Sequence, residues 1–146
     1  WLTDARIVML SIAMLSIWWQ LGYNMVIFLA GIQNISKSYY EAAEMDGASK
    51  LQQFFKITLP MLSPTTFFLS IMAIISSFQV FDQAFVLTRG GPGKASYTLV
   101  YHIYQQAFID FRFGSSAAGA VILFVAILVL TLIQFYAQKR WVHYEE

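Results

Sequence analysis

Three long apolar runs divide the chain. They cover residues 7–32, 64–87 and 115–137, and Asp82 is the only charged residue within them. A helix needs roughly 20 mostly apolar residues to cross a ~30 Å hydrocarbon layer, so each run is long enough to span a membrane. Lipid offers peptide groups no hydrogen-bonding partner, and the runs lack the alternation of barrel strands. The pattern predicts an all-α, polytopic membrane protein with three transmembrane helices.

The two connections between these runs are polar. Residues 33–63 carry charges of both signs and are long enough for two short helices. Residues 88–114 begin with the turn-rich sequence TRGGPGKAS and then place an apolar residue at every fourth position. This spacing predicts an amphipathic helix at the membrane interface. Its apolar positions are Leu99, Ile103, Ala107 and Phe111, and Tyr97, Tyr101 and Tyr104 suit the headgroup zone.

Composition supports an environment of membrane lipid. Of the 146 residues 58% are hydrophobic and only 12% are charged, whereas soluble domains carry about a quarter charged residues. The net charge of +1 provides no extended basic surface, so we expect no nucleic acid partner. The chain has no cysteine, which excludes disulfides and thiolate metal sites. It begins at Trp1 without a readable signal peptide, and we expect it to be part of a longer protein.

Basic residues do not decide the orientation in the membrane by themselves. If residues 33–63 and the C-terminal tail lie inside, the inner side carries five of the nine lysines and arginines and the outer side carries four. The inner residues would be Lys37, Lys50, Lys56, Lys139 and Arg140, and the outer residues Arg6, Arg89, Lys94 and Arg112.

The first polar connection has the signals of a helix, a turn and a second helix. Ser38 followed by Glu41 is a capping-box pattern that begins a short helix. Gly47 permits a sharp turn. A second helix is predicted over residues 48–58, and Pro60 is expected to end it, since the residue before a proline disfavours helical geometry. Small and apolar side chains on this unit, which suit docking to another protein, are Ala42, Ala43, Met45 and Leu51.

Residues 41–60 read EAAEMDGASKLQQFFKITLP. This run resembles the loop shared by permeases of binding-protein-dependent ATP-binding-cassette (ABC) importers: Glu-Ala-Ala, three residues, Gly, nine residues, then Ile, any residue, Leu-Pro. The resemblance implies a cytoplasmic coupling loop over residues 33–63 that docks in a groove on the ATP-hydrolysing subunit. The alternative is an ordinary amphipathic loop helix. The docking residues implied by the resemblance are Glu41, Ala42, Ala43, Asp46 and Gly47.

Two further runs, WWQLGYNMVIFLAGIQ and FQVFDQAFVLTRGGPG, look like the carbohydrate-uptake branch of the same family, with its maltose-type and glycerol-phosphate-type permeases. The resemblance implies that residues 1–146 are the C-terminal part of one permease domain with the type I importer fold, in a bacterial or archaeal cytoplasmic membrane. The implied partners are a second permease subunit, an ATPase dimer and an extracytoplasmic solute-binding protein. The implied cargo is a sugar or polyol, glycerol phosphate included. The alternatives are an amino acid, a peptide or an ion as cargo, or a membrane channel or enzyme outside this family.

Polar groups within the apolar runs are candidates for the solute path, because such groups are costly in lipid and are usually directed to a cavity or a neighbouring helix. The alternative is that they hydrogen-bond to another helix and only hold the helices together. Asp82, near the outer end, is expected to be structural. The candidates for the solute path are Gly22, Tyr23, Asn24, Ser77 and Gln79, and Trp18, Trp19, Phe78 and Phe81 offer flat faces for a sugar ring.

No catalytic or nucleotide-binding set is recognisable. Residues 91–95 resemble a phosphate-binding loop only faintly, because Thr88 stands where the first glycine belongs and Ala95 lacks the hydroxyl that binds magnesium. His102 and His143 lack ligands at metal-site spacing. We therefore expect a transport subunit that is not an enzyme and holds no cofactor, with ATP and magnesium bound by the partner ATPase.

Overall fold

The computed structural model describes residues 1–139 and residue 142, and within them every regular element is helical. The predicted all-α fold is thereby confirmed. Arg140 and His143, which entered the arguments on orientation and metal binding, lie outside the described residues. The elements, with π-helical turns labelled η, are α1 (Val8–Gln33), α2 (Lys37–Met45), α3 (Lys50–Gln53), η1 (Phe54–Thr58), α4 (Leu59–Met61), α5 (Ser63–Phe78), η2 (Ala84–Thr88), α6 (Leu99–Tyr104), η3 (Gln105–Ile109) and α7 (Phe113–Gln138).

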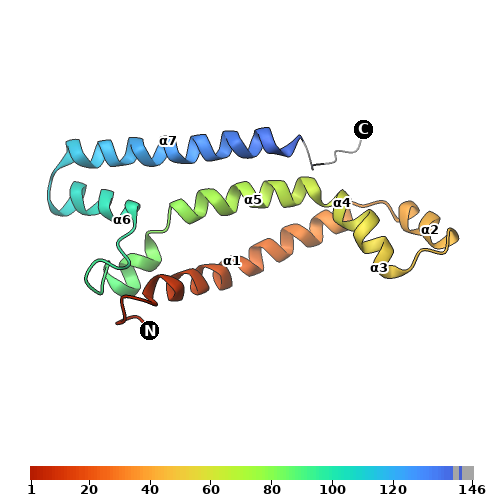
Figure 1. Ribbon diagram of the computed structural model, residues 1–146, viewed down its shortest axis with the longest axis horizontal. Coiled ribbons are helices and arrows are strands. Elements are labelled where there is room, and N and C mark those ends of the chain that lie inside the picture. The colour runs from red at the N-terminus through yellow and green to blue at the C-terminus, as the bar shows by residue number, and fades with distance from the viewer. Residues whose placement is uncertain (140–141, 143–146) are drawn as a thin grey trace.

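The three longest helices run along the long axis of the molecule, with α5 between α1 and α7 (Figure 1). Helices α1 and α7 have 26 residues each, about 39 Å at 1.5 Å per residue, and both are apolar enough to cross a membrane. They confirm the first and third predicted spans. Helix α7 packs on α5 through the rings of Phe67 and Phe135, 5.4 Å apart, and through a 3.3 Å hydrogen bond from Gln134 Nε2 to Ser70 Oγ.

The second predicted span, over residues 64–87, is not one continuous helix. Helix α5 ends at Phe78 after 16 residues, and helical structure resumes only beyond Phe81, leading into η2. The break is stabilised from elsewhere in the chain, because Thr98 Oγ1 donates a 2.7 Å hydrogen bond to the carbonyl oxygen of Val80. The Val80 carbonyl oxygen lies beyond the end of α5, and Thr98 gives it the hydrogen-bond partner that a backbone group away from water requires.

The best-packed core lies where the start of α1 meets η2 and α6, at the end of the molecule opposite α2 and α3 (Figure 1). Val8, Ile12, Ala84 and Tyr101 are buried there. The Tyr101 hydroxyl donates a 3.0 Å hydrogen bond to the Arg89 carbonyl oxygen, so this tyrosine belongs to the core and not to a membrane surface. Aromatic rings of η2 and α6 pack around the core, among them Phe85 and Tyr104, 5.4 Å apart.

The helix predicted in the second polar connection forms as α6 and η3, but it runs alongside the start of α7 instead of lying across the spans (Figure 1). Ile103 makes the contact: its carbonyl oxygen accepts a 2.9 Å hydrogen bond from Ser116 Oγ. Gly119 permits the close approach, because a Cβ there would lie 3.1 Å from Ile103 Cγ1. Phe111, the last predicted apolar position, lies beyond η3 and is exposed.

Candidate functional site

The elbow, residues 36–62, lies at one end of the molecule (Figure 1) and begins differently from the sequence prediction. Ser36, not Ser38, is the N-cap of α2: Ser36 Oγ accepts from the Ser38 backbone N–H at 3.4 Å. Ser38 is already inside the helix and so cannot cap it. A capping box does form at the start of α3, where the Ser49 N–H donates to Gln52 Oε1 at 2.8 Å and the Gln52 N–H donates to Ser49 Oγ at 3.4 Å.

The sharp turn predicted at Gly47 is confirmed. Gly47 has a φ of +75°, in the left-handed region that favours glycine. The Gly47 N–H donates to the Glu44 carbonyl oxygen at 3.0 Å, and the Ala48 N–H donates to the Ala43 carbonyl oxygen at 2.9 Å. This pair of hydrogen bonds is the Schellman motif, which satisfies the last carbonyls of a helix. Gly47 therefore ends α2 and turns the chain toward α3.

Two side-chain contacts close the turn. Lys50 Nζ forms an ion pair with Glu44 across it, and this hydrogen bond together with the lysine charge lowers the pKa of the Glu44 carboxyl. Gln53, which is buried, donates from Nε2 to the Ala48 carbonyl oxygen at 3.3 Å. The ion pair is exposed, and exposed pairs contribute little stability. The backbone geometry at Gly47 therefore dominates the shape of the elbow.

Pro60 does not end the second helix, contrary to the sequence prediction. The helical rod, defined as α3, η1 and α4, continues from Lys50 to Met61 and meets α5 at a bend of 59°. In η1 the Leu59 N–H donates to the Phe54 carbonyl oxygen, five residues back. Pro60 then occupies the first turn of α4, where the N–H that proline lacks is not needed.

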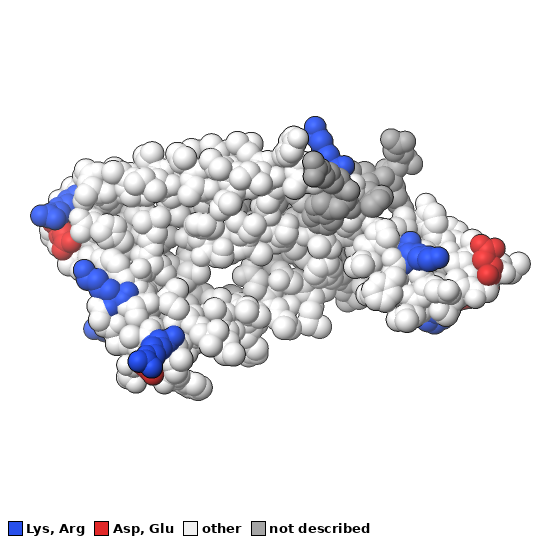
Figure 2. Space-filling view, viewed as in Figure 1, with Lys and Arg blue, Asp and Glu red and all other residues white. Residues whose placement is uncertain are grey.

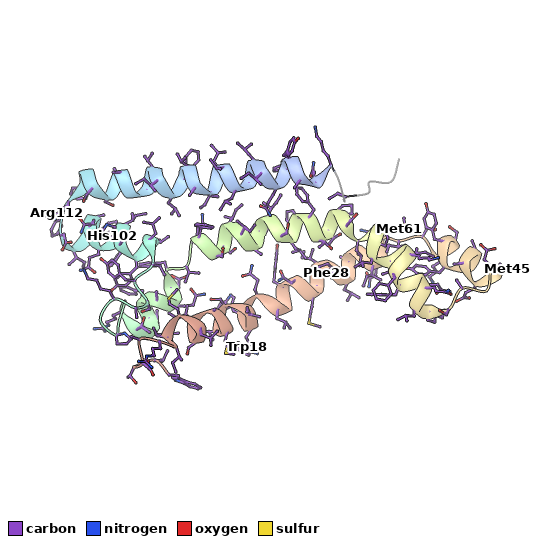
Figure 3. All side chains as sticks on the ribbon, in the orientation of Figure 1. Trp18, Phe28, Met45, Met61, His102 and Arg112 are labelled. Carbon is purple, nitrogen blue, oxygen red and sulfur yellow. The ribbon has the colours of Figure 1, made fainter. Side chains whose placement is uncertain are left out.

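The predicted docking residues lie together on this elbow, but not on one surface. Glu41, Ala42, Asp46 and Gly47 are exposed, whereas Ala43 is half-buried and its carbonyl belongs to the turn. Met45, one of the apolar side chains named for docking, is 90% exposed and lies at the tip of the elbow (Figure 3).

In the view of Figure 2 most charged side chains lie toward the two ends of the molecule, and one basic side chain lies at the upper edge between them. Helix α7 runs from the α6 end of the molecule toward the elbow and stops short of it, with Lys139 as its C-cap (Figure 1). Met45 is thus an exposed apolar side chain at the elbow end of the molecule.

A second candidate site is the cavity between α1 and α5, with a volume of about 660 Å³. Its wall is mixed, with amide and hydroxyl groups among apolar side chains. Asp82 is the only charged residue in it. The lining residues are Ser16, Ile17, Gln20, Leu21, Asn24, Met25 and Phe28 of α1, and Ala73, Ser76, Ser77, Gln79, Val80, Phe81, Asp82 and Gln83 of α5 and the segment after it.

The cavity brings together three of the five predicted path residues. Asn24, Ser77 and Gln79 line it, whereas Gly22 and Tyr23 do not. At about 100° per residue, Gly22 and Tyr23 are turned away from the α1 face that carries Asn24. The prediction missed Ser16, although its spacing from Gln20 and Asn24, four residues each time, marks one polar line along a helix. Trp18 and Trp19 are exposed and lie outside the cavity wall.

Comparisons with known proteins agree on one family. The family model described as "Binding-protein-dependent transport system inner membrane component" matches residues 1–143. The probable ABC transporter permease protein YesP of Bacillus subtilis is 43% identical over 99% of this chain and 47% of its own length. The sn-glycerol-3-phosphate transport system permease protein UgpA of Agrobacterium fabrum is 42% identical over 98% of this chain and 49% of its own.

A solved structure gives the same result. A crystal structure of a bacterial ABC transporter involved in the import of the acidic polysaccharide alginate matches 86% of this chain and 44% of its own, with a TM-score of 0.75 and 26% identity. The chain spans about half the length of the curated relatives it matches. With a family match over nearly its whole length, the chain belongs to the binding-protein-dependent transport system inner membrane components.

Proposed function

We propose that this chain is the C-terminal part of a multi-pass permease subunit in the cytoplasmic membrane, and that the whole protein imports a sugar or polyol by using ATP. The observation that carries the proposal is the elbow. It places the Glu-Ala-Ala and Gly47 pattern on an exposed turn beyond the apolar middle of the molecule. Such a turn is built to contact a partner and not to bury itself in its own chain.

The partner that suits the elbow is an ATP-hydrolysing subunit on the cytoplasmic side. The sequence has no phosphate-binding loop, so ATP and magnesium would be bound by an ATPase dimer. Ala42 is small and exposed, which permits close approach, and Met45 offers a flexible apolar contact. A second permease subunit would complete the path across the membrane, and an extracytoplasmic binding protein would deliver the solute.

The cavity supports a polyhydroxylated cargo. Gln20, Asn24 and Gln79 bring amides that can both donate and accept hydrogen bonds, as a sugar hydroxyl requires. Phe28 and Phe81 bring flat apolar faces to the same wall. This mixture of shape and a few placed polar groups is typical of small-molecule sites. The cargoes named for UgpA and for the alginate importer, a glycerol phosphate and a polysaccharide, also carry many oxygen groups.

The decisive experiment measures which solute stimulates ATP hydrolysis. The full-length permease would be assembled with its second permease and ATPase in vesicles, and binding protein loaded with one solute at a time would be added. We expect a sugar or polyol to stimulate hydrolysis. Stimulation by an amino acid, peptide or ion alone would contradict the cargo, and solute movement without any ATPase would contradict the whole proposal.

Asn24→Leu is expected to raise the KM of solute uptake about tenfold, because the cavity wall loses an amide that pairs with a solute hydroxyl. The measurement is initial uptake into vesicles at a series of solute concentrations. Tyr23→Phe is the matched control on the same helix: it also removes a polar group, but Tyr23 lies outside the cavity wall. An equal rise in KM for both variants would remove the cavity from the solute path.

A further inference from the structure

Helix α2 has an outer and an inner face, and Tyr40 lies on the inner one. Tyr40 and Ala43 are half-buried, whereas Glu41, Ala42 and Glu44 are exposed. Residues three apart on a helix share a face, so Tyr40 and Ala43 lie toward the rest of the elbow, while Glu41 and Glu44 lie on the outer face. Tyr40 is therefore placed to contact the elbow interior and not the partner.

The contact that Tyr40 makes is with the rod. Its hydroxyl lies 2.9 Å from the Thr58 hydroxyl, 18 residues further along the chain. Thr58 is only 8% exposed and is the last residue of η1. The ion pair of Lys50 with Glu44 also joins the rod to α2, but next to the turn, and Gln53 bonds to Ala48 within the turn itself. The Tyr40–Thr58 hydrogen bond thus joins α2 to the rod at a second, separate point.

Thr58 also connects to the membrane helices. Its carbonyl oxygen accepts a 3.0 Å hydrogen bond from the N–H of Leu62, at the bend between the rod and α5. Leu62 in turn packs on α1, because a Cβ on Gly31 would lie 2.9 Å from Leu62 Cδ2. A continuous set of contacts therefore leads from the inner face of α2 through Thr58 to the point where α1 and α5 meet.

We propose that the Tyr40–Thr58 hydrogen bond transmits movement of α2 to α5, which makes Tyr40 a positioning residue for the coupling of ATP hydrolysis to transport. The inference rests on the proposed docking role of the elbow. Without this bond, α2 is joined to the rod only at the Gly47 turn and to α1 only through residues 34–36, so it can tilt against the rod when an ATPase moves it. Held at two separate points, α2 and the rod move as one body, and the bend at Leu62 receives the whole displacement.

The test uses Tyr40→Phe in the full-length permease, assembled with its partners in vesicles. The ring that packs in the elbow is kept, and only the hydroxyl is lost. We expect capture of the ATPase to equal that of wild type, while the number of solute molecules moved per ATP hydrolysed falls about two- to tenfold, as suits the loss of one hydrogen bond. A purely structural role would lower the amount of folded complex without changing this ratio.

Matched variants make the result specific. Tyr39→Phe removes a hydroxyl from the neighbouring residue, whose side chain is 47% exposed, and is expected to keep the wild-type ratio. Thr58→Val is expected to lower the ratio as Tyr40→Phe does, and Thr58→Ser, which keeps a hydroxyl, to restore most of it. An unchanged ratio in Tyr40→Phe, or loss of ATPase capture by that variant, overturns the inference. Failure of the wild-type permease to capture the ATPase overturns the docking proposal instead.

Discussion

Gly47→Val is expected to lower solute uptake about tenfold or more while the full-length permease still reaches the membrane. The φ of Gly47 is +75°, and a Cβ there would meet no atom within 4 Å, so the cost arises from the backbone and not from a clash. A left-handed conformation costs an L residue about 1–2 kcal/mol, and a β-branched side chain makes it rarer still. The exposed turn then relaxes to another geometry and displaces α2. Uptake, ATPase capture and membrane fractionation are the measurements.

Gly47→Asn separates this backbone effect from the mere loss of a glycine. Asparagine visits the left-handed region more readily than other residues and is found at helix ends of this kind. We therefore expect this variant to keep most of the uptake and ATPase capture. If Gly47→Val transports as well as wild type, the turn is not needed for docking. If asparagine and valine are equally harmful, the left-handed geometry is not the reason.

Gly31→Leu is expected to destabilise the contact between α1 and the bend that leads into α5. A Cβ on Gly31 would lie 2.9 Å from both Leu62 Cδ2 and Thr65 Oγ1, closer than such atoms approach in proteins. Overpacking of this kind costs about 1–3 kcal/mol, so the melting temperature of the full-length permease in detergent is expected to fall by several degrees. Light-scattering or fluorescence unfolding curves provide the measurement.

Two further variants test the steric reason. Gly31→Ala is expected to have a smaller effect, because the ends of the Leu62 and Thr65 side chains can turn away from a single methyl group. Gly22→Leu places the same side chain on the same helix where a Cβ would meet nothing within 4 Å, and it is expected to leave the melting temperature unchanged. Equal destabilisation by leucine at both positions would show that loss of glycine, and not the close approach of α5, is responsible.

The first and last spans could be predicted from the sequence because an uninterrupted apolar run is a local signal. The end of α5 at Phe78, within the second predicted span, could not be predicted. Residues 79–81 are no less apolar than many helical segments, and the break there is stabilised by Thr98, whose hydroxyl reaches Val80 from 18 residues away. The path of residues 99–109 along α7 likewise depends on a tertiary contact, that of Ile103 with Gly119, which periodicity cannot reveal.

At the elbow, the turn at Gly47 was predictable from the sequence, whereas the N-cap of α2 and the helix end at Pro60 were not. Only Gly47 readily adopts the left-handed turn, so the sequence identified it. Ser36 and Ser38 can both cap a helix, and the pattern Ser38–Glu41 favoured the wrong one. Pro60 was expected to stop a helix, yet a wider π turn before it lets the helix continue. The sequence could not show that Asn24 lines the cavity while Gly22 and Tyr23 do not, because this depends on which face of α1 meets α5.

The shortness of α5 bears on where water enters the molecule. Sixteen residues reach only about 24 Å, some 6 Å less than the ~30 Å of hydrocarbon, so α5 alone is too short to cross it. Non-helical backbone at that depth is tolerated only where protein or water covers it. Gln79 and Asp82, at this break, line the cavity between α1 and α5. Under the proposed function, a solute would therefore meet these polar side chains below the lipid headgroups and not at the membrane surface.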